Sequence, residues 1–299
     1  MLVGLQLPSF TWPDRPASIG PRLGEIAGAA EEAGFASLWV MDHLWQLPPD
    51  TGLGGPEAPM LEAYTTLGFL ARATTRVRLG ALVGAVHFRE AGLLVKVATT
   101  LDVLSGGRAY LGLGAGWYEA EARGLGIPFP PRRERFERLE ETLQLAHQMW
   151  KGDRSPLEGR HVRAADPLLD PQPVSRPHPP IMIGGGGERV TLRLVASYGD
   201  ACNILVPDPG ESRHKLEVLR RHCEAVGRPY EEIEKTSLVE VDLRPGQQRP
   251  ADVVAALRAQ ADEGIEHVIV NMPDAETMRP LETFGREIIP ALAEVAART

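Results

Sequence analysis

The sequence predicts a single (β/α)8 TIM barrel that spans residues 1–299. Eight short β-like runs alternate with eight amphipathic or alanine-rich segments, and this strand-then-helix order is typical of the fold. The length of 299 residues also suits one such barrel. A doubly wound sheet, the alternative, needs fewer strands and usually carries a complete glycine fingerprint early in the chain. We find no linker that would divide the chain into domains.

Hydrophobic periodicity places the individual elements. The β-like runs are residues 2–7, 35–40, 77–86, 108–114, 180–185, 200–206, 235–243 and 266–272. The helical segments are residues 20–33, 61–74, 93–104, 134–150, 190–198, 211–226, 250–263 and 277–297.

Two connections are too long to be simple turns. Residues 44–60, rich in proline and glycine, directly follow the stretch WVMDH at residues 39–43, where the second β-like run ends. That position is the carboxyl-terminal mouth of a barrel, so we expect a lid there. Residues 151–178, rich in proline, aspartate and arginine, are expected as an insertion that packs over the same mouth.

Composition and charge argue against several classes of function. The net charge is −8, and the densest basic cluster, residues 131–138, also contains acids, so we expect no nucleic-acid partner. No apolar run reaches the length of a membrane span and no basic leader is visible, which predicts no membrane insertion and a cytoplasmic location. No metal site is predicted, because Cys202 and Cys223, like His214 and His222, lack the spacing of metal ligands.

An ionisable pair, Asp42 and His43, follows the end of the second β-like run and lies between Trp39 and Trp45. A strand buried on both faces has no use for such a pair unless something is bound or protonated there. His43 is the candidate for proton relay or hydrogen bonding to a ligand. Asp42 is expected to orient the His43 ring or to bond the ligand directly, and capping of the strand end is its structural alternative.

Two glycine-rich stretches follow strands and therefore open on the functional face of a barrel. Residues 112–124 lack the last glycine of a dinucleotide fingerprint, since Trp117 stands in its place. Residues 184–187 are four glycines that leave a strand and feed a helix, whose first turn offers unpaired N–H groups to an anion. We interpret this run as a phosphate site, with a tight turn as the alternative. Residues 105–107 precede a strand and predict only a turn at the opposite end.

These motifs, in this order, resemble the bacterial luciferase-like flavin oxidoreductase family. The resemblance rests on LDVLSGGR at residues 101–108, GLGAGW at 112–117 and IMIGG at 181–185, and it extends over nearly the whole chain. It implies a TIM barrel, usually dimeric, that binds reduced FMN or the deazaflavin coenzyme F420 at its carboxyl-terminal mouth.

The resemblance also implies a choice of cofactor. Asp42 and His43 occupy the position where F420-dependent members carry an Asp-His pair, whereas many luciferase-type monooxygenases carry Glu-His-His. This difference favours coenzyme F420 over FMN. A hydride that moves to or from such a ring changes its charge, and an imidazole of near-neutral pKa suits the accompanying proton.

Further cofactor contacts follow from the resemblance. Relatives hold a non-prolyl cis peptide bond behind the ring, which the alignment places between Leu82 and Val83. The tail of the cofactor is expected to run past Ala115 and Gly116. Its phosphate would meet the N–H groups of Gly185, Gly186 and Gly187.

Other residues have more than one interpretation. Sugar-phosphate dehydrogenases of the superfamily carry an acid where this chain has Trp117, which argues against the same substrate. An aromatic pocket wall is suggested instead by Trp12, Trp45 and Trp117. His87 could reach the ring or substrate, or be a packed histidine. Arg89 and Glu62 match the family pattern, and a buried ion pair or helix cap explains them as well as catalysis does.

Three functions remain open from the sequence. The leading one is an F420-dependent oxidoreductase that transfers hydride to or from a small organic substrate, with an F420-reducing enzyme as partner. The second is an FMN-dependent monooxygenase that uses oxygen and a partner flavin reductase. The third is a non-catalytic flavin-binding protein, which would need neither a proton relay nor a lid. We expect a homodimer from the resemblance.

Overall fold

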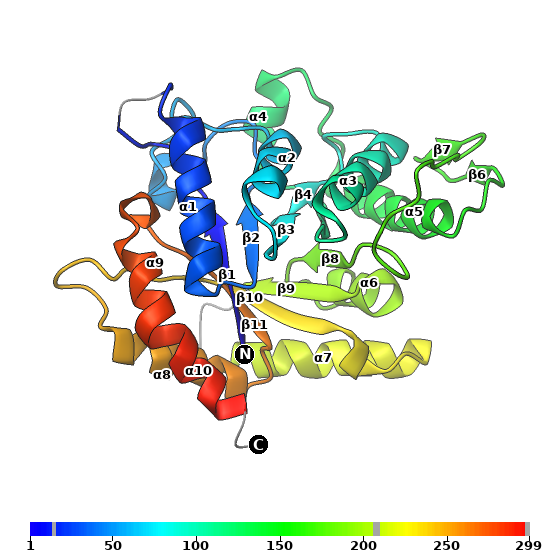
Figure 1. Cartoon of the computed structure of the whole chain (residues 1–299). Helices are drawn as coiled ribbons and strands as arrows, with labels where there is room; N and C mark the ends of the chain where they lie inside the picture. Colours follow the sequence, from blue (N-terminus) through cyan, green and yellow to red (C-terminus); the bar gives the residue numbers. More distant parts are fainter. Residues whose placement is uncertain (14–15, 206–209, 297–299) are drawn as a thin grey trace.

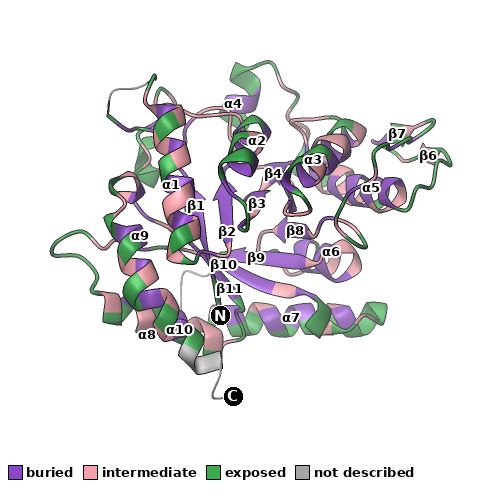
Figure 2. Cartoon of the chain, in the orientation of Figure 1, coloured by how far each residue is buried: buried purple, intermediate pink, exposed green. Residues whose placement is uncertain are grey.

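The computed structural model describes residues 1–13, 16–205 and 210–296, and its main feature is a wholly parallel sheet that forms a barrel (Figure 1). In spatial order the strands are β3 (Arg78–Ala81), β2 (Ser37–Val40), β1 (Leu2–Leu7), β11 (His267–Asn271), β10 (Glu234–Glu240), β9 (Ala201–Leu205), β8 (Ile181–Gly184), β5 (Leu111–Gly114) and β4 (Gly84–Ala85). These strands are mostly buried (Figure 2), as expected where helices cover a parallel sheet.

The two ends of this strand order belong to one interrupted strand, the predicted run at residues 77–86. β3 pairs with β2, β4 pairs with β5, and the Leu82–Val83 peptide bond between them is cis, as the resemblance implied. A parallel bridge between Leu79 and Ala109 joins β3 to the chain just before β5. The barrel therefore closes with β3 and β4 sharing one position, and the predicted TIM barrel is confirmed.

Helices surround the strands and turn their buried sides inward (Figure 2). They are α1 (Ile19–Ala33), α2 (Ala63–Ala73), α3 (Ala91–Ser105), α4 (Glu119–Gly124), α5 (Arg132–Trp150), α6 (Thr191–Tyr198), α7 (Glu211–Val226), α8 (Pro250–Asp262), α9 (Arg279–Thr283) and α10 (Ile289–Ala296). Gly106 ends α3 in the left-handed conformation with φ of 72°, which is the turn predicted at residues 105–107. No helix in the described ranges is long and apolar enough to cross a bilayer.

Some elements differ from the predicted ranges. α4 was not predicted, because six residues carry too little periodicity to be recognised. The predicted helix at residues 277–297 is divided into α9, a π-helical stretch at Phe284–Ile288, and α10. Residues 206 and 297, the ends of two predicted ranges, lie outside the described residues.

The first long connection, residues 44–60, lies at the mouth of the barrel, where it was predicted. It contains a short 3-10 helix at Pro49–Thr51. Leu47 and Leu53 border the large cavity described below. The connection is therefore placed where a lid would act.

The second long connection, residues 151–178, does not pack over the mouth, contrary to the prediction. It forms a hairpin of β6 (Leu157–Glu158) and β7 (Arg163–Ala164) beside α5 (Figure 1), where Glu141 accepts the backbone N–H groups that follow β6 at 2.7–3.0 Å. Ser175 then donates to Asp102 near the end of α3, at 2.6 Å. A segment between a helix and the next strand must return to the amino end of the barrel, which explains this course.

Candidate functional site

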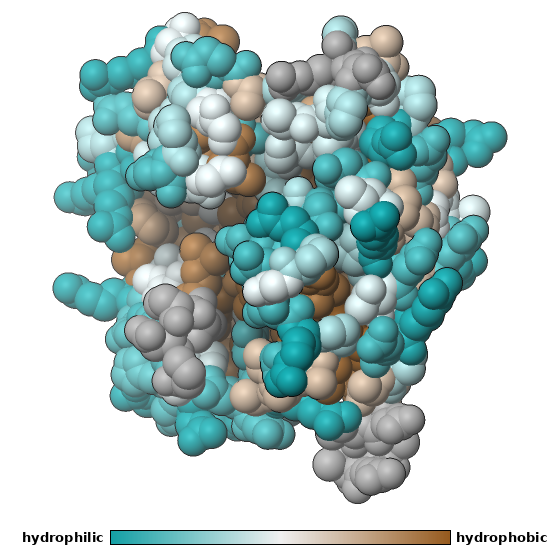
Figure 3. All heavy atoms as spheres, turned by 90° about the vertical axis from the view of Figure 1, so that its left-hand side faces the viewer, coloured by the Kyte–Doolittle hydropathy of each residue, from teal (hydrophilic) through white to brown (hydrophobic). Residues whose placement is uncertain are grey.

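The carboxyl ends of the barrel strands open into a cavity of about 580 Å³. Its wall contains every residue that the sequence suggested for cofactor or proton: Asp42, His43, Leu82, Val83, Ala115, Gly116, Gly185, Gly186 and Gly187. On the face drawn in Figure 3, apolar residues lie at the bottom of hollows in a largely polar surface. A concave site with a few convergent polar groups is the usual form of a small-molecule site.

His43 follows β2 and is hydrogen bonded to the buried carboxylate of Glu121 on α4. The distance from His43 Nδ1 to Glu121 Oε1 is 2.6 Å, and the two side chains are 15% and 1% exposed. Glu121 Oε2 also accepts the N–H groups of Leu44 at 2.7 Å and Trp45 at 3.2 Å. A carboxylate partner places the proton on Nδ1. Nε2 has no hydrogen-bond partner among the described residues, so it is available to a ligand.

Asp42 does not orient the His43 ring, contrary to the expectation. Its carboxylate binds Arg89 through two hydrogen bonds of 2.7 and 2.9 Å and accepts the Ala85 N–H at 3.2 Å. The reason is geometric, because neighbouring side chains of an extended chain point in opposite directions. Burial raises the pKa of Asp42, while the hydrogen bonds and charge of Arg89 oppose that rise. Asp42 thus ties the end of β2 to β4 beneath the cavity.

Arg89 joins three segments at this end of the barrel. Besides Asp42 it donates to Glu62 at 2.5 Å, and its guanidinium lies 4.8 Å from the centre of the Tyr64 ring. Glu62 is itself the N-cap of α2, since its carboxylate accepts the N–H of Thr65 at 2.7 Å. The structure therefore supports the interpretation of Arg89 and Glu62 as an ion pair and a helix cap.

Glu121 is the site residue that the sequence analysis missed. Glu119, two positions earlier in the same short helix, pairs with Arg123 on the surface at 2.7 Å. Residues two apart on a helix lie on different faces, so only Glu121 points inward. The one signal in the sequence is an acid shortly after a strand-ending glycine motif, which places it on the functional face.

Glycines form the part of the wall that faces Val83. A Cβ atom built on Gly184 would lie 2.6 Å from Val83 Cγ2, and one on Gly114 would lie 2.9 Å from the same atom. Neither distance is possible for a real side chain at these positions. The Val83 side chain, which follows the cis peptide bond, can therefore pack directly on the main chain of β5 and β8 only because these residues are glycine.

The glycine run before α6 has fewer free N–H groups to bind a phosphate than the sequence implied. The N–H of Gly185 donates to the carbonyl of Asn203 at 2.9 Å, so it cannot also serve a phosphate. The N–H groups of residues 186–187 have no acceptor among the described residues. Lys215, which pairs with Glu188 at 2.8 Å, lies beside Gly186. Free N–H groups near a cation suit an anionic ligand.

The three tryptophans do not form one aromatic wall. Trp117 lines the large cavity, stacks on Tyr118 with ring centres 5.3 Å apart, and meets the His43 ring edge-on at 5.6 Å. Trp12 lines a second cavity beside the first. Trp45 packs against α4. Of the three, only Trp117 could contact a ligand in the large cavity.

His87 carries a buried imidazole at the cavity wall. Neither of its ring nitrogens has a hydrogen-bond partner in the described part of the chain. The ring packs between Phe88 and Phe129, at centre-to-centre distances of 4.6 and 5.1 Å. Burial and the nearby charge of Arg135 lower the pKa of His87 to about 4. His87 is therefore neutral at pH 7.

Replacing His87 by phenylalanine is expected to remove an acid-sensitive part of the stability. The pKa is about 4 in the folded protein against 6.5 ordinarily, so the unfolded chain binds more protons between these values. This contribution is complete above pH 6.5 and is lost as the pH falls towards 4. Urea unfolding of both proteins at about pH 7 and about pH 4.5 measures it. A difference between the two proteins that does not change with pH would contradict the assignment.

Other histidines and the cysteines lie away from the cavity wall. His214 and His222 both bond to Glu188, at 3.1 Å to its carboxylate and 2.8 Å to its carbonyl. Cys202 and Cys223 are buried free thiols. Within the described ranges, no group of three or more His, Cys, Asp or Glu could hold a metal ion.

Known proteins match this chain along nearly its whole length. An F420-dependent glucose-6-phosphate dehydrogenase from Kineococcus radiotolerans is 28% identical, with 91% of this chain and 93% of the relative aligned. Among solved structures, the F420-dependent tetrahydromethanopterin reductase from Methanopyrus kandleri has a TM-score of 0.78 at 17% identity, covering 97% of this chain and 99% of that one. A monooxygenase from Streptomyces bottropensis has a TM-score of 0.81 at 19% identity, with coverage of 97% and 99%.

The two structures establish the shared barrel, and the match to a family model establishes the family. The profile of the luciferase-like monooxygenases covers residues 1–295, which confirms the resemblance seen in the glycine motifs. The chain belongs to the luciferase-like monooxygenase family.

Proposed function

We propose that this protein is a coenzyme F420-dependent oxidoreductase that transfers hydride between the coenzyme and a small organic substrate. The proposal rests on one observation: His43, whose Nε2 is free, lines the same cavity as the glycine run at residues 184–187. The name of the Kineococcus radiotolerans relative, an F420-dependent dehydrogenase, supports the choice of cofactor.

The residues of the cavity fit a deazaflavin cofactor with a phosphate-bearing tail. Leu82 and Val83 line the cavity, and the packing of Val83 on Gly114 and Gly184 fixes this part of the wall, where we place the ring. The N–H groups of residues 186–187 and the nearby Lys215 suit a phosphate. Ala115 and Gly116 line the wall, and we assign them to the tail between these two places.

His43 and Glu121 would carry the proton chemistry. When bound, coenzyme F420 supplies a ring that accepts or donates a hydride. His43 accepts or returns the substrate proton at Nε2, while Glu121 keeps the opposite nitrogen protonated and stabilises the imidazolium. Leu47 and Leu53, from the connection at residues 44–60, are placed to exclude water from the cavity.

An FMN-dependent monooxygenase is the alternative, because the Streptomyces bottropensis monooxygenase and the F420-dependent Methanopyrus kandleri reductase both share this fold. A binding titration of the purified protein with F420 and with FMN, each oxidised and reduced, separates the two. Tighter binding of F420 supports the proposal, and preferential binding of reduced FMN overturns it. Binding of F420 without turnover of any substrate would instead identify the third possibility, a non-catalytic carrier.

Replacing Gly186 by aspartate is expected to weaken F420 binding by about ten- to a hundredfold, because a carboxylate would face the phosphate at close range. The substitution fits sterically, since the nearest atom to a Cβ at Gly186 is 3.7 Å away. Fluorescence titration of the cofactor measures the affinity. Gly186→Asn, of equal size and no charge, is the control and should lose much less. Equal affinities of Gly186→Asp and the native protein would show that the phosphate lies elsewhere.

We further propose a homodimer in the cytoplasm, with a separate F420-reducing enzyme as partner wherever hydride passes from the coenzyme to the substrate. The exposed apolar side chains of α2 and α3 support the dimer: Phe69, Leu93 and Leu104 are 44%, 56% and 71% exposed. Light scattering of the purified protein gives the mass that tests it.

A further inference from the structure

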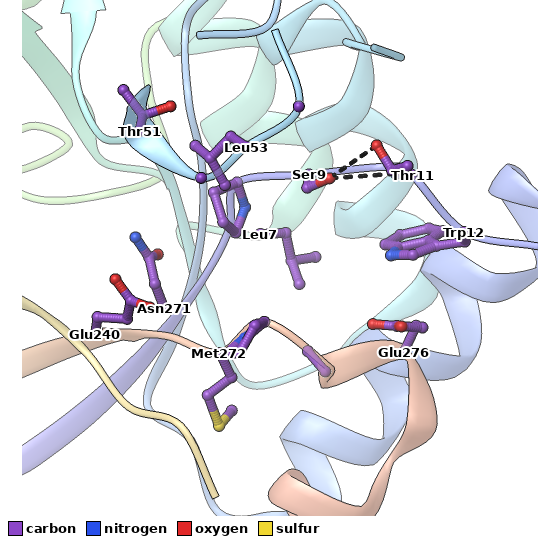
Figure 4. Close-up of a pocket in the computed structure, with 15 residues that line it drawn as sticks. Leu7, Ser9, Thr11, Trp12, Thr51, Leu53, Glu240, Asn271, Met272 and Glu276 are labelled. Carbon is purple, nitrogen blue, oxygen red and sulfur yellow. Dashed lines mark hydrogen bonds between the residues drawn. The ribbon is translucent and has the colours of Figure 1, made fainter. Parts of the chain in front are cut away.

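A second cavity of about 320 Å³ lies beside the large one and shares Leu53 and Asn271 with it. Its wall is formed by the ends of β1, β10 and β11 and by the connection at residues 44–60 (Figure 4). None of the residues assigned to the cofactor lines it. It is therefore a separate compartment that borders the proposed cofactor site.

The ionisable side chains of this cavity are two carboxylates, those of Glu240 and Glu276. Glu240 and Asn271 are aligned neighbours on β10 and β11, and Glu276 follows β11 in a 3-10 turn. Asn271 Oδ1 is buried and has no partner in the described part of the chain. Neither Glu240 nor Glu276 has an ion-pair partner there. An occupant of this cavity must therefore offer hydrogen-bond donors or positive charge.

Cationic side chains are absent from this wall, as far as the structure describes the chain: no lysine, arginine or histidine lines it. Arg244 is near enough to interact electrostatically with Glu240. However, its guanidinium already donates hydrogen bonds of 2.6 and 2.9 Å to Asp242. A phosphorylated substrate would meet two carboxylates and no compensating cation. Such juxtaposition of like charges opposes binding.

Trp12 adds an aromatic face to the same cavity. It lines the wall together with Glu276, and Figure 4 shows the two side chains on one side of the cavity. The Trp12 side chain is held by Phe10, whose ring centre is 5.6 Å away. An indole face beside a carboxylate is a typical site for an alkylammonium group.

We propose, on the basis of the function proposed above, that the second cavity is the substrate site for a small cationic alcohol, an ammonium compound that also carries a hydroxyl group. Trp12 and Glu276 hold the ammonium group, while Glu240, beside Asn271 on the opposite side of the cavity (Figure 4), adds negative charge to the same wall. Asn271, at the boundary of the two cavities, donates a side-chain amide N–H to the oxygen of the reacting hydroxyl, whose own hydrogen faces His43 Nε2. The carbinol C–H leaves as hydride to the oxidised coenzyme, the O–H proton goes to His43 Nε2, and a carbonyl compound is formed.

Calorimetric titration of the F420-loaded protein tests the charge preference with three probes. Choline carries the ammonium group and a hydroxyl group, dimethylbutanol is its neutral isostere, and glucose 6-phosphate is the phosphorylated comparison. Choline should bind about tenfold more tightly than dimethylbutanol, and glucose 6-phosphate should bind more weakly than either. Equal binding of choline and its isostere, tighter binding of glucose 6-phosphate, or no choline binding would overturn the inference.

Two variants and one control localise the effect. Glu276→Gln should reduce choline affinity several-fold and Glu240→Gln, across the cavity, should reduce it less, while dimethylbutanol affinity stays the same in both variants. Glu158→Gln, on the distant β6 hairpin and 75% exposed, should change neither. F420 binding is measured first for every protein. Failure of F420 binding would reject the proposed function, whereas normal F420 binding without a choline preference would reject only the substrate class.

Discussion

Replacing His43 by alanine should lower kcat by about 10²–10⁴-fold and leave the affinity for F420 within a few-fold of the native value, because general acid–base catalysis typically contributes that factor. The His43 side chain lines the cavity, with Nε2 free and Nδ1 hydrogen bonded to the Glu121 carboxylate. The variant should fold, since Glu121 keeps the bonds from the N–H groups of Leu44 and Trp45. Stopped-flow measurement of F420 reduction with a substrate found by screening gives the rate.

The Glu121→Gln variant tests whether His43 carries a proton or only lines the cavity. A glutamine can still accept the two N–H bonds, but its amide would donate to His43 Nδ1 and place the ring proton on Nε2. The ring then has the wrong tautomer to accept a proton, so kcat should fall while KM changes little. Tyr118→Phe, at the same wall, is the matched control and should keep its activity. Normal turnover by both His43→Ala and Glu121→Gln would exclude proton transfer at this position.

Main-chain patterns allowed the sequence to predict the barrel and the wall of the cavity. Strand ends and glycines occupy fixed places in a (β/α)8 barrel, so residues such as Gly116 and Gly186 could be assigned to one cavity although they are far apart along the chain. The cis bond after Leu82 followed from the resemblance and agrees with the structure.

Side-chain partners were less predictable, because they depend on directions that periodicity does not supply. Asp42 and His43 are adjacent in the sequence, yet one binds Arg89 and the other Glu121. The course of residues 151–178 was also mispredicted, since nothing in its composition distinguishes a cover over the mouth from a hairpin along α5. Both errors concern tertiary contacts between segments distant in sequence.

Replacing Arg89 by methionine is expected to lower the free energy of unfolding by about 3–5 kcal/mol at pH 7, the usual effect of removing one partner from a buried ion pair. Methionine retains an apolar chain that can pack near Tyr64, so the loss would reflect mainly the charge. Asp42, only 2% exposed, would keep the single N–H bond from Ala85. Urea unfolding followed by circular dichroism measures the change.

The pH dependence identifies Asp42 as the origin of that loss. Arg89 opposes the rise in pKa that burial causes at Asp42. Without Arg89 the pKa of this carboxyl rises further in the folded state, while its value in the unfolded chain stays the same. The folded variant then binds more protons than the unfolded chain, and its deficit relative to the native protein should shrink as the pH falls from 7 towards about 4. Adding Asp42→Asn to the variant should likewise recover stability.

Arg22→Met, which breaks the exposed pair with Glu25, should cost less than about 1 kcal/mol. If Arg89→Met cost no more than this surface control, the Asp42–Arg89 pair would not hold β2 and β4 in place beneath the cavity.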